Sequence, residues 1–362
     1  MRILRVTPSY PRINLYGSGS NAYYHTREMT CDTMVLTYFK EGNLVDNLTH
    51  AKVMQINAKN QLINFMHTKS LVISLSMKIF FQFKFLFKSI VTLHKYRPNI
   101  VHVYTPIPMM VGLYCKLFFS SKVFISLHGT DAKRISESRI LAKFMGWTNG
   151  ILVVSKEMAR LPSISRLNTY FMGNGFDENI YKKDDRYIVK DQIINVGNFR
   201  WQKNHCLLIK AFKVFLSQYP EFKLLLVGEG PEQCKIEKLV RSLKLNNNVK
   251  FLGPKTPNEV NQLLNESKFF VLSSISEGSP KVVLESMATG TPVVSTNVGN
   301  VKHLVENIGI IAKENTSDEL STSMMNMLSI LDNQLINKTV DQAIQYSWKS
   351  VAKRLNLIYK EN

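Results

Sequence analysis

Two glutamates eight positions apart stand out in the second half of the chain. Glu277 and Glu285 belong to the segment Ser-Glu-Gly-Ser-Pro-Lys-Val-Val-Leu-Glu (276–285), which follows an apolar run at 269–273. Paired carboxylates of this kind could accept hydrogen bonds from the hydroxyls of a sugar or a ribose. The alternative is that both glutamates are merely solvated on a capped helix.

The residues between the two glutamates have the composition of a helix start. Ser279 and Pro280 suit the cap and the first position of a helix, where the missing N–H of proline costs nothing. The free N–H groups of a first turn, together with the helix dipole, attract an anion such as a diphosphate. Gly278, Ser279 and Lys281 are therefore candidate anion-binding residues.

A second candidate segment, Val-Gly-Asn-Phe-Arg-Trp-Gln-Lys-Asn (196–204), carries two cations between a strand and a helix. Lys203 and Arg200 are placed to hold a diphosphate at the point where negative charge develops as it leaves. Solvated basic residues ahead of a helix are the alternative. A weaker candidate is Gly17-Ser18-Gly19, whose backbone amides could face phosphates or an acceptor, with a flexible linker as the alternative.

Apolar runs rich in Val, Ile and Leu recur along the chain and predict buried parallel strands, each followed by a helical pattern. The runs lie at 3–7, 100–104, 123–127 and 151–154, and then at 193–196, 223–227, 249–252, 269–273 and 292–295. Helices are predicted at 204–218, 232–243 and 280–289. This alternation predicts two doubly wound α/β domains, and ligands bind beyond the carboxyl ends of such strands. We expect the site in a cleft between the two sheets.

The boundary between the two domains is predicted within 172–192, where a glycine-rich turn precedes a run of charges. The first domain should cover 1–172 and the second 173–345, with a last helix at 346–362 returning to the first domain. Two histidines of the first domain differ in context. His128 directly follows a strand, whereas His102 lies within one and is expected to be a packed core residue.

The segment from 193 to 300 resembles glycosyltransferase family 4. The resemblance rests on the Glu-x7-Glu spacing of Glu277 and Glu285, and on motifs that surround it: Leu-Glu-Ser-Met-Ala (284–288), Gly-Thr-Pro-Val-Val (290–294), Val-Gly-Glu-Gly-Pro (227–231), Phe-Leu-Gly (251–253) and Tyr-Ser-Trp (346–348). Before residue 193 the resemblance is patchier, as expected of an acceptor-binding half that varies with its acceptor.

The resemblance implies a GT-B fold and a hexosyltransferase that retains the anomeric configuration, without a covalent enzyme intermediate. Glu277 would hold the donor sugar, Glu285 the ribose, and Lys203 the diphosphate. His128, in a strand-then-His-Gly turn, would contact the donor sugar and phosphate. Gly228 and Gly253 would lie in the nucleotide site.

The chain departs from the family pattern at one phosphate contact. Members often carry an arginine beside the glycine at 197, whereas this chain has Asn198 there and Arg200 two positions later. Either residue is a candidate for the second phosphate contact. The family needs no metal, the sequence has no Asp-x-Asp motif, and no cofactor is expected because the nucleotide sugar, most commonly a uridine nucleotide, is a substrate.

Charge is concentrated in the first half of the chain. Residues 1–170 carry 22 basic and 7 acidic side chains, whereas 171–362 carry 24 and 20. Phenylalanines at 80, 81, 83, 85 and 87 alternate with Lys78, Lys84 and Lys88, a pattern suited to an anionic membrane surface, although a buried helix with snorkelling lysines would look similar. Each lysine near such a surface contributes about 1 kcal/mol. The three lysines argue against a membrane-spanning helix at 71–93.

These patterns together predict a peripheral enzyme on the cytoplasmic face of the cell membrane. The resemblance implies that it would transfer a hexose or an N-acetylhexosamine from a nucleotide sugar to a lipid-linked saccharide, in lipopolysaccharide or capsule synthesis. Four scattered cysteines, without metal spacing, predict reduced, buried thiols of a cytoplasmic protein. The alternatives are a nucleic-acid-binding protein, for which no recognisable module is present, and a GT-B sugar-nucleotide epimerase.

Overall fold

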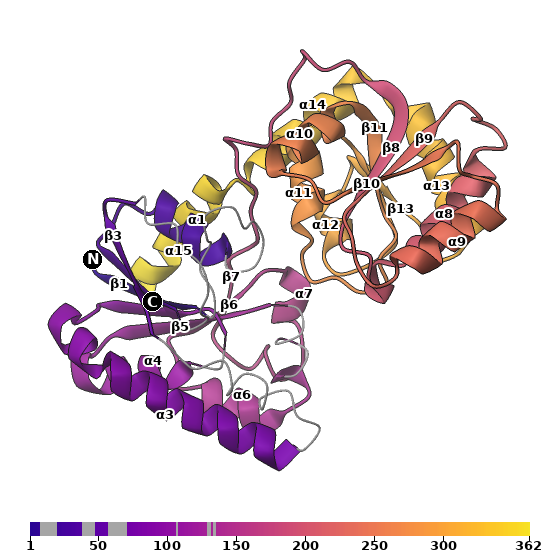
Figure 1. Cartoon of the computed structure of the whole chain (residues 1–362). Coiled ribbons are helices and arrows are strands. Elements are labelled where there is room, and N and C mark those ends of the chain that lie inside the picture. The colour runs from indigo at the N-terminus through magenta and orange to yellow at the C-terminus, as the bar shows by residue number, and fades with distance from the viewer. Residues whose placement is uncertain (8–19, 38–47, 57–70, 106–107, 129–131, 133–134) are drawn as a thin grey trace. The chain divides into compact units, whose positions relative to one another are not determined.

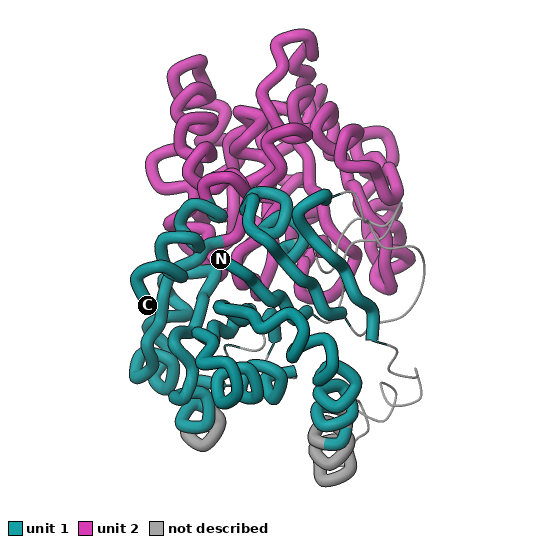
Figure 2. Tube along the Cα trace, turned by 90° about the vertical axis from the view of Figure 1, so that its left-hand side faces the viewer, with its two compact units in different colours: residues 1–173, 351–362 teal, residues 174–350 magenta. Residues whose placement is uncertain are grey.

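A computed structural model of the chain describes residues 1–7, 20–37, 48–56, 71–105, 108–128, 132 and 135–362. At Ser20, 71–79, Phe81 and 139–141 it describes the backbone alone. The chain divides into two compact units, and Figure 2 colours them separately. Unit 1 comprises residues 1–173 and 351–362, and unit 2 comprises 174–350.

Unit 1 is built on a seven-stranded parallel sheet with the order β3-β2-β1-β4-β5-β6-β7. Its strands are β1 (Ile3–Thr7), β2 (Thr33–Thr37), β3 (Ala51–Gln55), β4 (Ile100–Val103), β5 (Lys122–Leu127), β6 (Gly150–Val153) and β7 (Thr169–Phe171). Its helices are α1 (Ser20–Glu28), α3 (Leu71–Tyr96), α4 (Met109–Phe119), α6 (Arg139–Met145) and α7 (Lys156–Ala159). Figure 1 shows α3, α4 and α6 on one face of this sheet and α1 on the other.

Unit 2 is built on a six-stranded parallel sheet with the order β10-β9-β8-β11-β12-β13. Its strands are β8 (Lys190–Val196), β9 (Lys223–Val227), β10 (Val249–Gly253), β11 (Ser267–Leu272), β12 (Val293–Ser295) and β13 (Gly309–Ile311). Its helices are η1 (Trp201–Lys203), α8 (His205–Phe215), α9 (Gln233–Ser242), α10 (Pro257–Asn265), α11 (Lys281–Ala288), α12 (Val301–Leu304), α13 (Ser317–Ile330) and α14 (Asn333–Ile344).

Two apolar cores hold unit 2 together, one on each face of the sheet. Side chains of α8, α9 and α13 pack on one face, where Phe212 and Phe215 are fully buried. Side chains of α10, α11, α12 and α14 pack on the other, around Phe270 and Met287. Strands buried on both faces explain the continuous apolar runs in the sequence. The predicted fold class, two doubly wound parallel-sheet units, is confirmed.

The return of the chain to unit 1 comes later than the predicted residue 346. Residues 346–350 stay in unit 2 because they pair with the start of that unit. The N–H of Phe176 donates to the carbonyl of Tyr346 at 3.2 Å, and the N–H of Trp348 donates to the carbonyl of Phe176 at 3.1 Å. Helix α15 (Trp348–Glu361) then contributes residues 351–361 to unit 1.

Four strands of the structure, β2, β3, β7 and β13, were not predicted from the sequence. Within the described residues, no helix has the length and apolar character needed to cross a membrane. His102 is fully buried, as predicted. Cys115 is buried but Cys234 is exposed, so the expectation of buried thiols is wrong for Cys234.

Candidate active site

The central strands of unit 2 form a topological switch point. From β8 the chain adds strands toward β10, and from the neighbouring β11 it adds strands toward β13. Open α/β sheets bind ligands outside the carboxyl ends of their strands at such a point. Two hydrogen bonds join the loops that follow β8 and β11: the Ser273 hydroxyl donates to the Lys203 carbonyl at 2.9 Å, and the Ile275 N–H donates to the Gln202 carbonyl at 2.8 Å.

An ion pair spans these two loops. The Lys203 ammonium lies 2.6 Å from Oε1 of Glu277, and the Ser274 hydroxyl donates to the same oxygen at 2.7 Å. Both charged side chains are largely buried, with 25% and 13% of their surface exposed. Oε2 of Glu277 has no hydrogen-bond partner among the described residues. The site therefore presents a fixed cation and a carboxylate oxygen with unused acceptor capacity.

Glycines let the turns after β8 and β9 approach each other and the lysine. Gly228 has φ 132°, and a Cβ there would lie 2.2 Å from the carbonyl oxygen of Gly197. A Cβ on Gly197 would meet the Lys203 side chain at 3.4 Å. Gly253 has φ 66° with open space where a Cβ would stand, and its carbonyl accepts from the Gly228 N–H at 2.9 Å. The predicted glycines Gly228 and Gly253 thus adjoin the same strand ends.

Helix α11 begins one residue later than predicted. Pro280 is the N-cap residue, with φ −71° and ψ 118°, and Lys281 is the first helical residue. Ser279 stands one residue ahead of this cap and is bonded by two asparagines instead. Asn174 donates to its carbonyl at 3.0 Å, and Asn300 donates to its hydroxyl at 3.2 Å. These two asparagines fix the loop at Gly278 and Ser279, ahead of the amino end of α11.

Glu285 and Lys281 lie one turn apart on α11 in a desolvated environment. Burial raises the pKa of Glu285 to about 7, although Lys281 and a hydrogen bond from Tyr181 oppose the shift. Burial likewise lowers the pKa of Lys281 to about 8, opposed by Glu285. The ammonium of Lys281 stands 5.3 Å from the ring centre of Trp348. A carboxyl with a pKa near 7 changes its charge around neutral pH, and its capacity to accept hydrogen bonds from a ribose changes with it.

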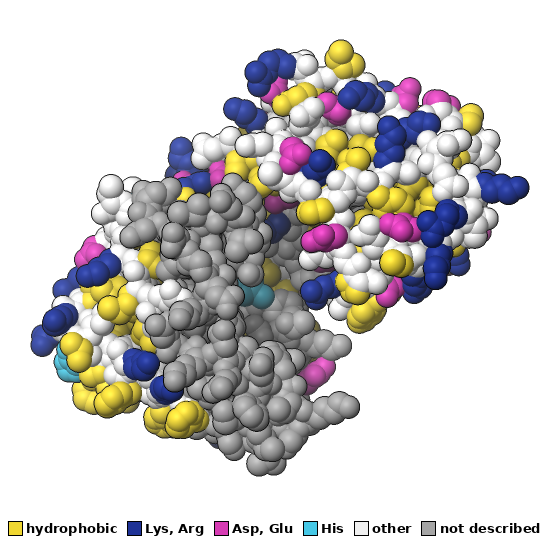
Figure 3. Space-filling view, viewed as in Figure 1, with side chains coloured by type: hydrophobic (Ala, Val, Ile, Leu, Met, Phe, Trp, Pro, Cys, Tyr) yellow, Lys and Arg dark blue, Asp and Glu magenta, His cyan; other side chains and the backbone are white. Residues whose placement is uncertain are grey.

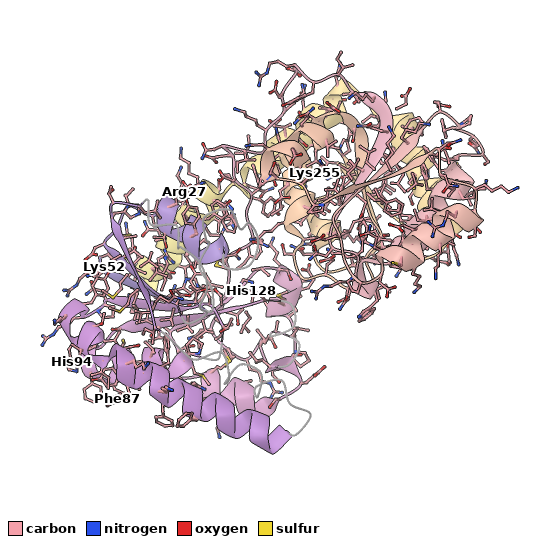
Figure 4. The ribbon with its side chains drawn as sticks, in the orientation of Figure 1. Arg27, Lys52, Phe87, His94, His128 and Lys255 are labelled. Carbon is pink, nitrogen blue, oxygen red and sulfur yellow. The ribbon has the colours of Figure 1, made fainter. Side chains whose placement is uncertain are left out.

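The remaining predicted residues are more scattered. Arg200 and Asn198 are both exposed on the loop after β8, so either side chain is accessible to a ligand. His128 follows β5 in unit 1, and Figure 4 labels it there. Gly17, Ser18 and Gly19 lie outside the described residues. Within the described ranges, no group of three or more His, Cys, Asp or Glu side chains is placed to hold a metal ion.

Three residues that position the site were not singled out from the sequence. Ser274 bonds Glu277, and Asn300 bonds Ser279. Gly299, with φ 50°, permits the close approach of its loop, because a Cβ there would lie 2.6 Å from the Glu277 carbonyl oxygen. The Val-Gly-Asn turn at 298–300, after an apolar run, was the available signal for the last two.

Comparison with solved structures identifies the fold. The HepE protein of Anabaena, solved in complex with UDP, superposes with a TM-score of 0.78 at 18% identity and covers 100% of both chains. At that identity the likeness shows the fold alone. It is the GT-B fold: two parallel-sheet α/β units.

Sequence comparison gives the family. The model for glycosyl transferases group 1 matches residues 177–347, and the model for Glycosyltransferase Family 4 matches residues 35–161. The chain belongs to the family 4-like GT-B glycosyltransferases. Both models describe glycosyltransferases, the class of enzyme that the sequence predicted.

Two relatives carry names that specify a sugar. N-acetyl-alpha-D-glucosaminyl L-malate synthase of Bacillus anthracis is 29% identical over 231 residues, which cover 58% of this chain and 59% of the relative. A phosphatidylinositol N-acetylglucosaminyltransferase protein of Arabidopsis thaliana is 25% identical over 209 residues, which cover 57% of this chain and 47% of the relative. The alignments thus span about half the length of these relatives.

Proposed function

We propose that the chain is a retaining hexosyltransferase that moves a hexose or an N-acetylhexosamine from a UDP-sugar to a lipid-linked saccharide. The observation that carries this proposal is the Lys203–Glu277 pair at the switch point of unit 2. Relatives named for N-acetylglucosaminyl transfer support the class of sugar, and a structural neighbour solved with UDP supports the nucleotide.

The ion pair suggests how the donor is received. In the free protein Glu277 neutralises Lys203 at 2.6 Å. A diphosphate carries more negative charge than a carboxylate, so we propose that it replaces Glu277 as the partner of Lys203. Glu277 then accepts hydrogen bonds from hydroxyls of the donor sugar. Arg200, exposed on the same loop, supplies a second cation, and Glu285 accepts from the ribose.

Transfer breaks the bond between the anomeric carbon and the diphosphate and forms a bond from that carbon to the acceptor oxygen on the same face. The acceptor hydroxyl passes its proton to the departing phosphate oxygen. Lys203 and Arg200 stabilise the charge that develops on the diphosphate. We further propose that His128 contacts the donor sugar and its phosphate. Because protein cations meet the diphosphate, transfer should continue in the presence of a chelator.

The proposed setting is the cytoplasmic face of the cell membrane, in the assembly of a surface polysaccharide such as lipopolysaccharide or capsule. Unit 1 holds 25 Lys and Arg against 8 Asp and Glu, whereas unit 2 holds 21 against 19. A water-soluble acceptor would give no reason to concentrate positive charge on one unit. An anionic lipid surface carrying the acceptor would.

The test is a transfer assay with a panel of nucleotide sugars and lipid-linked saccharide acceptors. We expect one UDP-hexose or UDP-N-acetylhexosamine to give acceptor-dependent release of UDP, and NMR of the product to show the anomeric configuration of the donor. Lys203→Ala should lose both transfer and affinity for UDP. Inversion of configuration would contradict the proposed stereochemistry, and unchanged UDP binding by Lys203→Ala would remove Lys203 from the site.

A matched lysine serves as the control. Lys190 forms an ion pair with Glu266 at the same 2.6 Å. It is the first residue of β8, however, and so lies at the amino end of the strand, away from the carboxyl end where Lys203 follows. Lys190→Ala should leave transfer and UDP binding unchanged. Release of free sugar without any acceptor would favour the epimerase alternative. Salt-dependent binding to nucleic acid, without any nucleotide-sugar turnover, would favour a nucleic-acid-binding protein.

A further inference from the structure

An exposed apolar stripe runs along α3 and continues onto α4 in unit 1. The stripe, which we call the α3–α4 face, consists of six large side chains that are each between 55 and 77% exposed: Phe80, Phe83, Phe87, Val91, Leu117 and Phe118. The four residues on α3 recur every three or four positions, so they share one side of the helix. Contiguous exposed apolar side chains mark a surface that meets another apolar phase.

Aromatic contacts join the two helices into one surface. His94 of α3 packs edge-on against Phe119 of α4, with 5.2 Å between the ring centres. Nε2 of His94 also forms a 2.7 Å hydrogen bond with the Tyr114 hydroxyl. Tyr114 in turn stacks on Phe118 at 4.5 Å. Figure 4 shows Phe87 and His94 on the outer side of α3, and Figure 3 shows hydrophobic side chains gathered there beside Lys and Arg.

Only some of the phenylalanines at 80–87, which the sequence assigned to a membrane surface, are exposed in the structure. Phe85 is only 2% exposed and belongs to the core, whereas Phe80, Phe83 and Phe87 are exposed. The side chains of Phe81 and Lys78 lie outside the described ones. Leu117 and Phe118 of α4, more than twenty residues away in the sequence, extend the surface and were not predicted to do so.

The positive charges around the α3–α4 face indicate which kind of partner it binds. Between Asp46 and Asp131 the chain has ten Lys and Arg residues and no Asp or Glu. Lys88 and Lys95 are exposed on α3 itself, and Arg97 is exposed directly after it. A second copy of this chain would bring these cations against their own equivalents, and an apolar protein partner would offer them no anion. An anionic bilayer provides acyl chains for the phenyl rings and phosphates for the lysines.

We propose that the α3–α4 face docks the protein onto an anionic lipid bilayer, with Phe83, Phe87, Leu117 and Phe118 inserted among the lipids. This inference deepens the proposed function, on which it rests for its biological purpose: it brings unit 1 to the surface where a lipid-linked acceptor lies. The physical claim concerns only the vesicle surface, so it can be tested without turnover.

The experiment is flotation with vesicles of phosphatidylglycerol and phosphatidylcholine in equal parts, and with vesicles of phosphatidylcholine alone. The wild type should bind the anionic vesicles and be released by high salt, which screens the lysines. Phe87→Glu/Leu117→Glu should weaken binding by about tenfold or more, because it places charges at the inserted positions. Both side chains are exposed, so the fold should survive.

The matched control applies the same change to exposed apolar side chains of unit 2. Ile188 and Ile344 are 80 and 58% exposed, and Ile188→Glu/Ile344→Glu should bind vesicles as the wild type does. In Phe87→Trp, tryptophan emission should shift to the blue on addition of anionic vesicles. Equal binding by Phe87→Glu/Leu117→Glu, or no blue shift, would overturn the proposal.

Two further readouts separate this inference from its rivals and from the proposed function. Light scattering of the free protein should show a monomer, and a dimer abolished by Phe87→Glu/Leu117→Glu would assign the face to a second copy instead. Stabilisation of Phe87→Glu/Leu117→Glu by UDP should match that of the wild type. Vesicle binding without any sugar transfer would leave the docking face standing while the proposed function fails.

Discussion

The two units share a sheet topology but place their polar groups differently. In unit 2 the charged groups stand at the ends of the central strands, where Lys203 meets Glu277. In unit 1 a cation lies in the middle of β1, an interior strand of the sheet. Arg5 is fully buried there and donates to the Tyr104 hydroxyl at 3.0 Å and to the His25 carbonyl at 3.1 Å.

The buried polar cluster around Arg5 in unit 1 bonds helix α15. The Tyr359 hydroxyl of α15 lies 2.6 Å from Nδ1 of His102, and Arg5 approaches the same hydroxyl at 3.4 Å. Burial, aided by the charge of Arg5, holds the pKa of His102 well below its usual range, and burial raises the pKa of Tyr104 to about 12. Polar groups in mid-strand are thus locked by the fold, whereas those at strand ends remain available for chemistry.

The largest effect should come from adding a side-chain atom where the turns after β8 and β9 are in close contact. In Gly228→Ala the new Cβ would stand 2.2 Å from the Gly197 carbonyl oxygen, on a residue with φ 132°. We expect a loss of about 4 kcal/mol in the free energy of unfolding, among the exceptional values for one substitution. Urea denaturation followed by circular dichroism measures it.

A second glycine of the same site provides the control. Gly253 also has a positive φ, 66°, but a Cβ there would meet open space. Gly253→Ala should therefore cost only about 1 kcal/mol, the penalty for a left-handed residue that is not glycine. Equal losses for the two variants would show that backbone conformation, and not the contact between the turns, constrains Gly228.

The next effect concerns the carboxylate at the strand end. Glu277→Gln keeps the size of the side chain but removes its charge and one acceptor oxygen. We expect turnover to fall about a hundredfold, as when one well-placed polar group is removed from an active site. Glu259→Gln, which breaks the exposed pair with Lys255 at 3.0 Å, should leave turnover unchanged. Near-normal turnover of Glu277→Gln would make Glu277 a residue that only organises its loop.

Much of the sheet architecture could be predicted because buried parallel strands are continuous apolar runs. Strand β9 (Lys-Leu-Leu-Leu-Val) is of this kind. The missed strand β3 includes Lys52 and Gln55 and is only partly buried, and β7 and β13 have three residues each, too few to show a pattern. The start of α11 was placed one residue early because Ser279 is bonded to Asn300, a contact between loops that are distant in the sequence.

The candidate site was predicted as separate residues and not as an arrangement. Lys203 and Glu277 each had the residue type and the strand-end position that phosphate and sugar binding need. Their pairing depends on β8 and β11 being neighbours, which only the order of the strands in the sheet decides. The supporting hydroxyl of Ser274 could not be predicted, because a serine in a loop has no periodicity that separates it from other polar residues.

A smaller effect is expected from the buried cluster of unit 1. Tyr359→Phe removes the hydroxyl that lies 2.6 Å from Nδ1 of His102 and leaves that buried ring nitrogen with only the longer contact to Arg5, at 3.4 Å. The free energy of unfolding should fall by about 2 kcal/mol, and the loss should appear in unit 1. Tyr219→Phe is the control, since the Tyr219 hydroxyl bonds no described residue while its ring stacks on Phe215. Equal stabilities would show that the helix is held by apolar packing alone.

The smallest expected effect is a pH dependence of donor binding through Glu285. Its pKa of about 7 means that the carboxyl loses its charge, and part of its capacity to accept hydrogen bonds from a ribose, as the pH falls through neutrality. Affinity for a UDP-sugar should therefore fall about fivefold between pH 7.5 and pH 6, where roughly nine in ten carboxyls are protonated. Lys281, whose pKa is about 8, stays mostly charged in this window.

Calorimetry with the intact UDP-sugar is the appropriate measurement, because its diphosphate is a diester that does not titrate there, whereas free UDP does. Glu285→Gln should bind more weakly at pH 7.5 and show no slope. A histidine at the phosphates would give the opposite slope, since it gains positive charge as the pH falls. Tighter binding at pH 6 would therefore assign the pH response to a histidine and remove Glu285 from the ribose.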